Sequence, residues 1–289
     1  MALMAEVLPM TQALLSFPAP AKLNLGLKVT GRRSDGYHLL ETVFHFLDYG
    51  DTVQIRIRDD GLVERSSELA GVPAEQDLVV RAARLLQSFT GTGLGATIHV
   101  EKRIPMGGGL GGGSSDAATV LMALNHLWGT GVDRDTLMGL GVRLGADVPV
   151  FIFGNSAFAT GIGELLTPID VPPMWYCVFH PGVNVPTAEI FSSKLLTRDS
   201  APSIMPILET TQRRRNDLQS VVCDRYPAVS ELLNELKEYG LPLMTGSGSC
   251  CFIEVESRSE ADKVYRSMSG RYSGFVAKGM NCHPLKDIV

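Results

Sequence analysis

The feature that most constrains this sequence is a glycine run between two patterned segments. Six glycines occupy the seven positions from Gly107 to Gly113, and Ser114-Ser115-Asp116 follow directly. Ile98 and Val100 alternate with polar residues before the run, and apolar residues recur at helical spacing after it, from 117 to 128. The N–H groups at the start of a helix lack partners, and glycines let the backbone curl around an anion. The order strand, glycine loop, helix therefore predicts a phosphate-binding loop.

Two common phosphate-loop patterns fit this run poorly. The spacing of G-x-x-x-x-G-K-[ST] is present, but Ser114 stands where the lysine is required, which excludes a P-loop. The dinucleotide pattern G-x-G-x-x-G matches between Gly107 and Gly112, yet such a match is nearly automatic in a glycine run. The charged residues at 101–103 replace the buried strand end that a dinucleotide site needs. The motif thus disfavours a dehydrogenase.

Length and charge exclude several classes of protein. The 289 residues carry 26 Lys+Arg and 31 Asp+Glu, so the net charge of −5 disfavours nucleic acid and anionic membranes as partners. The triplet Arg213-Arg214-Arg215 is accordingly expected to be a solvated surface. No apolar run approaches the ~18 residues of a membrane span. Five cysteines without metal-ligand spacing predict reduced thiols. We expect a cytoplasmic protein whose partners are small molecules.

Hydrophobic periodicity divides the chain into a strand-rich first part and a second part that mixes strands and helices. A boundary near 168–173 predicts two domains, residues 1–170 and 171–289. A helix from 78 to 89 is expected to be capped by Asp77 and to bury Leu78, Ala82, Leu85, Leu86 and Phe89. The other expected helices cover 117–128, 135–144, 188–196, 227–239 and 260–268, and the expected strands cover 23–29, 38–46, 53–57, 98–100, 148–153, 174–179, 250–255 and 275–281.

Three segments together resemble the GHMP kinases. They are residues 18–25, which include Lys22 and Asn24, the glycine segment 105–118, and the second glycine loop, 243–249. The resemblance implies an α/β (α+β) fold of two domains, the first resembling ribosomal protein S5 and the second ferredoxin-like. It also implies that ATP and a substrate meet in the cleft between these domains.

Further segments resemble one branch of that family, whose members phosphorylate 4-diphosphocytidyl-2-C-methyl-D-erythritol with ATP. They are Asp35-Gly36-Tyr37-His38 and Gly145-Ala146-Asp147-Val148-Pro149, with supporting matches at 180–187 and 275–279. This resemblance implies transfer of the γ-phosphoryl group of ATP to the 2-hydroxyl of the cytidyl substrate, in the non-mevalonate route to isoprenoid precursors.

The resemblance also implies roles for individual residues. Asp147 is the expected base and Lys22 its partner, although each is also of a type common at helix ends and strand ends. Asp116, in the first helical turn, either complements the helix dipole or contacts Mg²⁺. The residues expected to bind ATP are Pro105, Met106, Gly107, Gly108, Gly109, Leu110, Gly111, Gly112, Gly113, Ser114 and Ser115.

The cytosine of such a substrate needs an aromatic surface and a hydrogen-bonding edge. Tyr37 is expected to stack on it and His38 to read its edge, with Phe191 as a possible second wall. Asn24 either holds the substrate near Lys22 or is simply the polar face of a strand. Two other functions stay open: another GHMP kinase of a small alcohol, and a catalytically silent nucleotide-binding protein.

Overall fold

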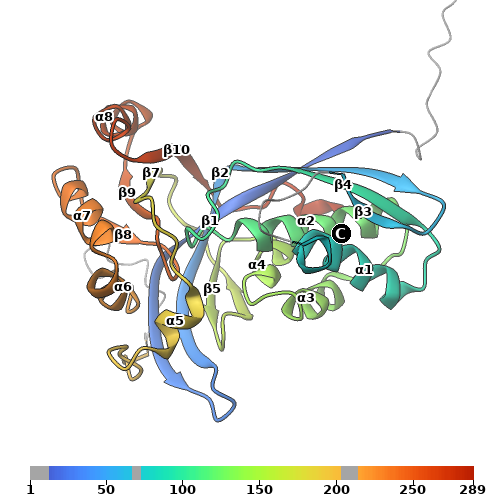
Figure 1. Ribbon diagram of the computed structural model, residues 1–289, viewed down its shortest axis with the longest axis horizontal. Coiled ribbons are helices and arrows are strands. Elements are labelled where there is room, and N and C mark those ends of the chain that lie inside the picture. The colour runs from blue at the N-terminus through green and yellow to red at the C-terminus, as the bar shows by residue number, and fades with distance from the viewer. Residues whose placement is uncertain (1–12, 67–72, 203–213) are drawn as a thin grey trace, which may run out of the picture.

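The computed structural model describes residues 13–66, 73–202 and 214–289 (Figure 1). The first half of the chain forms a sheet around a long antiparallel pair of strands, β1 (Leu15–Arg32) and β2 (His38–Arg58). On the other side of β2 the sheet continues with β4 (Gly95–Glu101) and the short β3 (Val63–Arg65). The two strands predicted at 38–46 and 53–57 are thus one. Gly50 permits this continuity, because a Cβ there would lie 2.3 Å from the carbonyl oxygen of Ala19 on β1.

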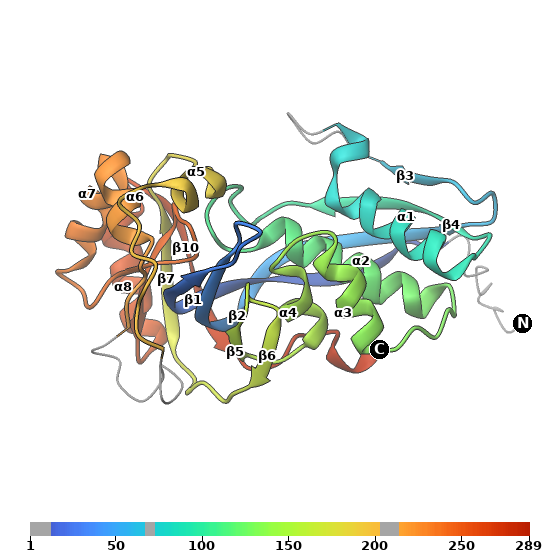
Figure 2. The same cartoon turned by 90° about the horizontal axis from the view of Figure 1, so that it is seen from below.

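Four helices cover one face of this sheet (Figures 1 and 2): α1 (Leu78–Thr90), α2 (Gly112–Leu127), α3 (Arg134–Val142) and α4 (Val148–Phe153). The predicted cap of α1 is confirmed, since the Asp77 side chain accepts a hydrogen bond from the Val79 N–H. Its expected face is correct at Ala82 and Leu86 and wrong at Phe89, which is exposed. A hairpin of β5 (Ala157–Thr160) and β6 (Leu165–Pro168) then pairs with β2.

The apolar run at 148–153 was expected to be a strand and is instead helix α4. All but its last residue is buried, so no polar face revealed a helical period. Pro149 lies in the first turn, where its missing N–H costs no hydrogen bond, and Gly154 ends the helix with a left-handed φ of 78°. The helix places Asp147 at its N-cap.

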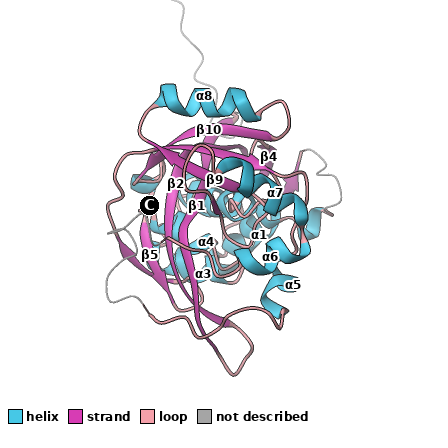
Figure 3. Ribbon diagram, turned by 90° about the vertical axis from the view of Figure 1, so that its left-hand side faces the viewer, coloured by secondary structure: helices cyan, strands magenta, loops and turns pink. Residues whose placement is uncertain are grey.

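The second half of the chain forms an antiparallel sheet in the order β8 (Leu243–Met244), β9 (Cys251–Val255), β7 (Trp175–His180) and β10 (Ser273–Met280). Its helices are α5 (Thr187–Ser192), α6 (Gln219–Arg225), α7 (Pro227–Leu236) and α8 (Arg258–Met268). Helices α6 to α8 lie at the end of the molecule that is on the left in Figure 1 and faces the viewer in Figure 3. Short 3₁₀ turns occur at Ala74–Gln76 and Lys286–Ile288. The two-domain α/β expectation is confirmed.

Alternating residues of the second sheet pack on opposite sides. Cys177 and Phe179 of β7 contact the core beneath the helices, whereas Tyr176 and Val178 contact β1 and β2 of the first half. β10 also pairs with β2, so one sheet runs through both halves. This packing leaves a cleft where the glycine segments of the two halves meet.

Arg214 departs from the expected solvated surface. It is half-buried and ion-paired with Glu254 of β9, a partner that the sequence did not indicate. Arg215 is exposed as expected, and Arg213 lies outside the described residues. No helix in residues 13–66, 73–202 and 214–289 has the length and apolarity to cross a membrane.

Candidate active site

A cleft of about 930 Å³ lies between the two halves of the chain. The glycine segment 105–113 lines it from one half, and the 246–248 loop and α5 line it from the other. The residues expected to be catalytic or to bind substrate also line this cleft: Lys22, Asn24, Tyr37, His38, Asp147 and Phe191. Of the residues expected to bind ATP, Ser115 alone is absent from the lining, because its hydroxyl donates to the Pro20 carbonyl in the interior.

The glycine loop separates its backbone acceptors from its donors. Its carbonyl groups face the protein, while no described residue accepts a hydrogen bond from the N–H groups between Met106 and Ser114. These free donors precede the N-terminus of α2, which carries partial positive charge. The arrangement suits an anion with several oxygen atoms. The donors to the carbonyls of Gly107, Gly108, Gly109, Leu110 and Gly111 are, respectively, Ser249 N, Cys250 N, Lys22 Nζ, Lys22 N and Ser115 N.

Glycine is required at Gly109 for two reasons. Its φ of 75° is left-handed, and a Cβ there would lie 2.2 Å from the Thr245 carbonyl oxygen. The hydroxyl of Thr245 in turn donates to the Gly109 carbonyl at 3.3 Å. The second glycine loop therefore packs directly on the first and holds its shape.

Lys22 and Asp147 meet beside this loop. Lys22 Nζ lies 3.1 Å from Asp147 Oδ2 and donates to Asn24 Oδ1 at 2.6 Å and to the Gly109 carbonyl at 3.0 Å. Two hydrogen bonds and one ion pair thus compensate the charge of a lysine whose side chain is only 2% exposed. The Asp147 side chain is 35% exposed, and its Oδ1 has no partner among the described residues. That oxygen is available to a ligand in the cleft.

Asn24 is held at both ends of its side chain. Its amide oxygen accepts from Lys22, and its Nδ2 donates to Thr42 Oγ1 at 2.8 Å. The Thr42 hydroxyl in turn donates a hydrogen bond to the Gly26 carbonyl at 2.6 Å. This chain of hydrogen bonds fixes the rotamer of Asn24 and, through it, the position of the Lys22 ammonium.

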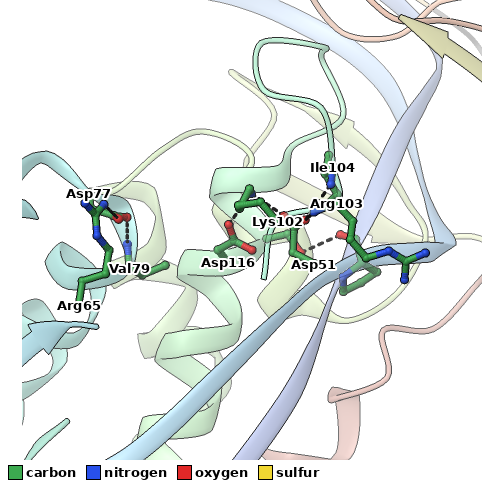
Figure 4. A network of polar contacts seen from close by, with 10 residues as sticks. Asp51, Arg65, Asp77, Val79, Lys102, Arg103, Ile104 and Asp116 are labelled. Carbon is green, nitrogen blue, oxygen red and sulfur yellow. Dashed lines mark hydrogen bonds and ion pairs between the residues drawn. The ribbon is translucent and has the colours of Figure 1, made fainter. Parts of the chain in front are cut away.

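A second lysine lies between Asp51 of β2 and Asp116 of α2 (Figure 4). Asp116 was expected in the first helical turn, but α2 begins at Gly112, which places Asp116 in the second turn. Lys102 Nζ is 2.5 Å from Asp51 Oδ2 and 2.7 Å from Asp116 Oδ2. Asp51 also accepts from the N–H groups of Arg103 and Ile104, which anchors the approach to the glycine loop. Burial, opposed by the Lys102 charge, raises the pKa of Asp116 to about 7. Asp116 Oδ1 is buried without a hydrogen-bond partner in the described part of the chain.

Three rings line the other end of the cleft. The ring centroids of His38 and Phe191 are 5.1 Å apart, whereas Tyr37 is 59% exposed beside them. The turn predicted at Asp35-Gly36 presents Tyr37 to solvent, because Gly36 has a φ of 94° and Asp35 Oδ1 accepts from the Tyr37 N–H. The structure thus brings the three predicted rings together, with Tyr37 open to a planar ligand.

Sequence reasoning missed several residues of this site. Thr245 was predicted only as part of a glycine loop, although a hydroxyl next to Gly246 can hydrogen-bond to a neighbouring loop, as it does here to the Gly109 carbonyl. Asp51 gave no signal, because its partners are distant in sequence. Arg198 lies outside every quoted motif, yet it donates to His38 Nε2 at 3.0 Å.

Comparisons with known proteins agree with this architecture. Residues 77–155 match the family model described as GHMP kinases N terminal domain, and residues 194–274 match the one described as GHMP kinases C terminal. Homoserine kinase from Cytophaga hutchinsonii has a similar structure, with a TM-score of 0.64 over 98% of each chain. At 17% identity, that similarity concerns the fold alone.

More similar proteins share one name. The 4-diphosphocytidyl-2-C-methyl-D-erythritol kinase of Chromobacterium violaceum is 63% identical over 94% of this chain and 97% of its own. The enzyme of the same name from Neisseria gonorrhoeae is 50% identical over the same shares. A crystal structure of 4-(cytidine 5'-diphospho)-2C-methyl-D-erythritol kinase matches with a TM-score of 0.79 and 34% identity, covering 92% of this chain and 99% of that one. The chain therefore belongs to the GHMP kinases and, within them, to the family of 4-diphosphocytidyl-2-C-methyl-D-erythritol kinases.

Proposed function

We propose that this chain is an ATP-dependent kinase that phosphorylates the 2-hydroxyl of 4-diphosphocytidyl-2-C-methyl-D-erythritol, giving the 2-phosphate and ADP. The reaction belongs to the non-mevalonate route to isoprenoid precursors. The observation that carries the proposal is the position of the Lys22–Asp147 pair. It lies in the same cleft as the free N–H groups of the glycine loop and the three rings. The names of the relatives support the choice of substrate.

ATP binds with its phosphates on the N–H groups from Met106 to Ser114. The substrate hydroxyl lies against Asp147 Oδ1, which accepts its proton as the oxygen attacks the γ-phosphorus and the bond to the β-phosphate oxygen breaks. Phosphoryl transfer has a loose transition state and depends mainly on positioning and charge stabilisation. Lys22 supplies both, because it orients Asp147 and places a fixed positive charge beside the transferred group.

Asp116 is the proposed contact for Mg²⁺. Its Oδ1 is a buried carboxylate oxygen without a partner in the described chain, and burial raises the pKa of Asp116 although the Lys102 charge opposes the shift. Mg²⁺ in nucleotide sites takes one or two carboxylates and completes its octahedron with phosphate oxygens and water. The donor set therefore fits. When bound, the ion neutralises charge on the phosphates.

The cytosine end of the substrate lies between Tyr37 and Phe191, and His38 reads its edge. This end is remote from Asp147, so it determines substrate choice and does not take part in phosphoryl transfer. Asn24 is proposed to act on the substrate through Lys22, since both ends of its amide are engaged by the protein.

Release of ADP by the purified chain tests the proposal. We expect release in the presence of Mg²⁺ and the cytidyl alcohol, and little with homoserine or mevalonate. Equal release with a non-cytidyl alcohol would indicate a different GHMP kinase. Binding of ATP without release from any alcohol would indicate a silent nucleotide-binding protein.

A further inference from the structure

Arg198 is not among the residues that line the cleft, but it contacts His38, which lines it. Its Nε donates to His38 Nε2 at 3.0 Å, and its two terminal nitrogens donate to three backbone carbonyls in the segment from α5 to the next loop. Four hydrogen bonds from one guanidinium fix its plane. The accepting carbonyls are those of Phe191, Ser193 and Leu196.

This contact determines where the imidazole of His38 carries its proton. A guanidinium has five N–H donors and no acceptor, and it does not lose its charge in proteins. His38 Nε2 must therefore accept, so in the neutral ring the proton is on Nδ1. No residue of the described chain bonds to Nδ1, and His38 lines the cleft. The ring thus offers one N–H donor to a ligand.

The surroundings of the ring favour its neutral form. Burial lowers the pKa of His38 from 6.5, and the charges of Arg198 and Arg32 lower it further. The nearby carboxylate of Asp35 is paired with Arg33 at 2.7 Å and accepts from the Tyr37 N–H. A charged imidazole would carry a second proton at Nε2, directly against the Arg198 donor.

We propose that Arg198 is a specificity-determining residue: by holding His38 as the Nδ1–H tautomer, it makes the ring a donor that matches N3 of cytosine and opposes the N3–H of uracil. The inference rests on the proposed function, because it assigns His38 to the base of the substrate. Cytosine N3 is an unprotonated acceptor, whereas the same atom of uracil carries a hydrogen. A ring with the proton on Nε2 would present an acceptor at Nδ1 and reverse this preference.

The same guanidinium also links two walls of the base site. It holds the carbonyl of Phe191 while it holds the ring of His38, and these two rings are 5.1 Å apart. Arg198 thereby couples the residue that reads the edge of the base to a residue that packs on its face. A purely structural arginine would support the loop without setting the tautomer, so the two roles can be separated by experiment.

The test combines nitrogen NMR with nucleotide binding. In the ¹⁵N-labelled wild-type protein, the His38 resonances should show a protonated Nδ1 and an unprotonated Nε2 at pH 7.5. In Arg198→Met, the Nε2–H form should appear, and the preference for CDP over UDP should fall by about 5- to 150-fold, the range for a polar group left unmatched. Ser193→Ala is the matched control. It removes a hydrogen bond to the Leu195 N–H in the same loop and leaves the Arg198 contact intact.

Several results would overturn the inference. One is a wild-type His38 with its proton on Nε2; another is an unchanged CDP/UDP ratio in Arg198→Met after the tautomer has switched. A loss of selectivity in Ser193→Ala as large as in Arg198→Met would assign the effect to the loop. Failure of the proposed function is seen separately, as absence of ADP release with the cytidyl alcohol while His38 still carries its proton on Nδ1.

Discussion

Lys22 Nζ lies closer to Asn24 Oδ1, at 2.6 Å, than to Asp147 Oδ2, at 3.1 Å. The amide of Asn24 is itself fixed by Thr42. The lysine is therefore positioned from the rigid β1–β2 pair, and the more exposed Asp147 is aligned against it. Because Asn24 fixes Lys22 and Lys22 aligns Asp147, Asn24 is a positioning residue for the proposed reaction.

Asn24→Ala should lower kcat more than it raises KM for the cytidyl substrate. The change removes a buried hydrogen bond from the Lys22 ammonium, and such a bond to a charged group contributes about 1.5–3 kcal/mol, or roughly 10- to 150-fold in rate. Steady-state kinetics separates the two parameters. A rise in KM with kcat unchanged would instead place Asn24 in direct contact with the substrate.

Asp147→Asn should reduce kcat by about 10²–10⁴, the usual contribution of a positioned proton acceptor. The amide is nearly isosteric and lies at the N-cap of α4, so the fold and the affinity for ATP should change little. Single-turnover rates and ATP titration measure the two effects. Near-normal turnover would exclude Asp147 as the base.

Gly109→Ala should weaken ATP binding by at least about tenfold. A left-handed φ costs a residue with a Cβ roughly 1–2 kcal/mol, and the new methyl would also press on the Thr245 carbonyl. Gly113→Ala is the matched control, because its Cβ meets only Leu78 Cδ1 at an ordinary 3.5 Å. Calorimetric titration with ATP compares the two variants. If ATP binding is weakened equally in both variants, the left-handed backbone conformation at Gly109 has no special role in binding ATP.

Tyr37→Ala should weaken binding of CDP by about 5- to 150-fold, since stacking of an aromatic ring on a base contributes ~1–3 kcal/mol. Tyr37→Phe keeps the ring and should bind nearly as the wild type does. Fluorescence or calorimetric titration distinguishes them. If Tyr37→Ala binds CDP normally, the base lies elsewhere in the cleft.

Acid should destabilise the fold through His45. Burial lowers its pKa from 6.5 to about 4, with a further contribution from the Arg214 charge, and Nδ1 lies 2.8 Å from Ser156 Oγ. The unfolded chain then binds more protons than the folded one between these values, so stability is full above pH 6.5 and falls as pH decreases toward 4. At about 1.4 kcal/mol per pH unit, the loss is on the order of 3 kcal/mol.

Denaturant unfolding at several pH values measures this loss. His45→Asn, which can still bond to Ser156, should be less stable at neutral pH and should show a flatter dependence between pH 6.5 and 4. His283 acts in the same direction, because burial lowers its pKa to about 3. A slope that is unchanged in His45→Asn would assign the acid sensitivity to other groups.

The sequence by itself determined the local features of this protein. The glycines from Gly107 to Gly113 before a periodic helix predict a phosphate loop, because backbone freedom and free N–H groups are properties of a short segment. Asp77 capped its helix as predicted, and the motifs that contain Lys22, Tyr37 and Asp147 were sufficient to indicate the family. Each of these signals lies within a few consecutive residues.

Tertiary structure decided what depends on distant partners. Residues 148–153 form a helix although their apolar run allowed a strand, because burial on every side removed the periodic signal. The glycine loop takes its shape from Thr245, and Lys22 its position from Asn24 and Thr42. Arg198 reaches His38 across 160 positions of the chain. Hydrogen bonds between such separated groups form only once the sheet and its helices are packed, so no local pattern encodes them.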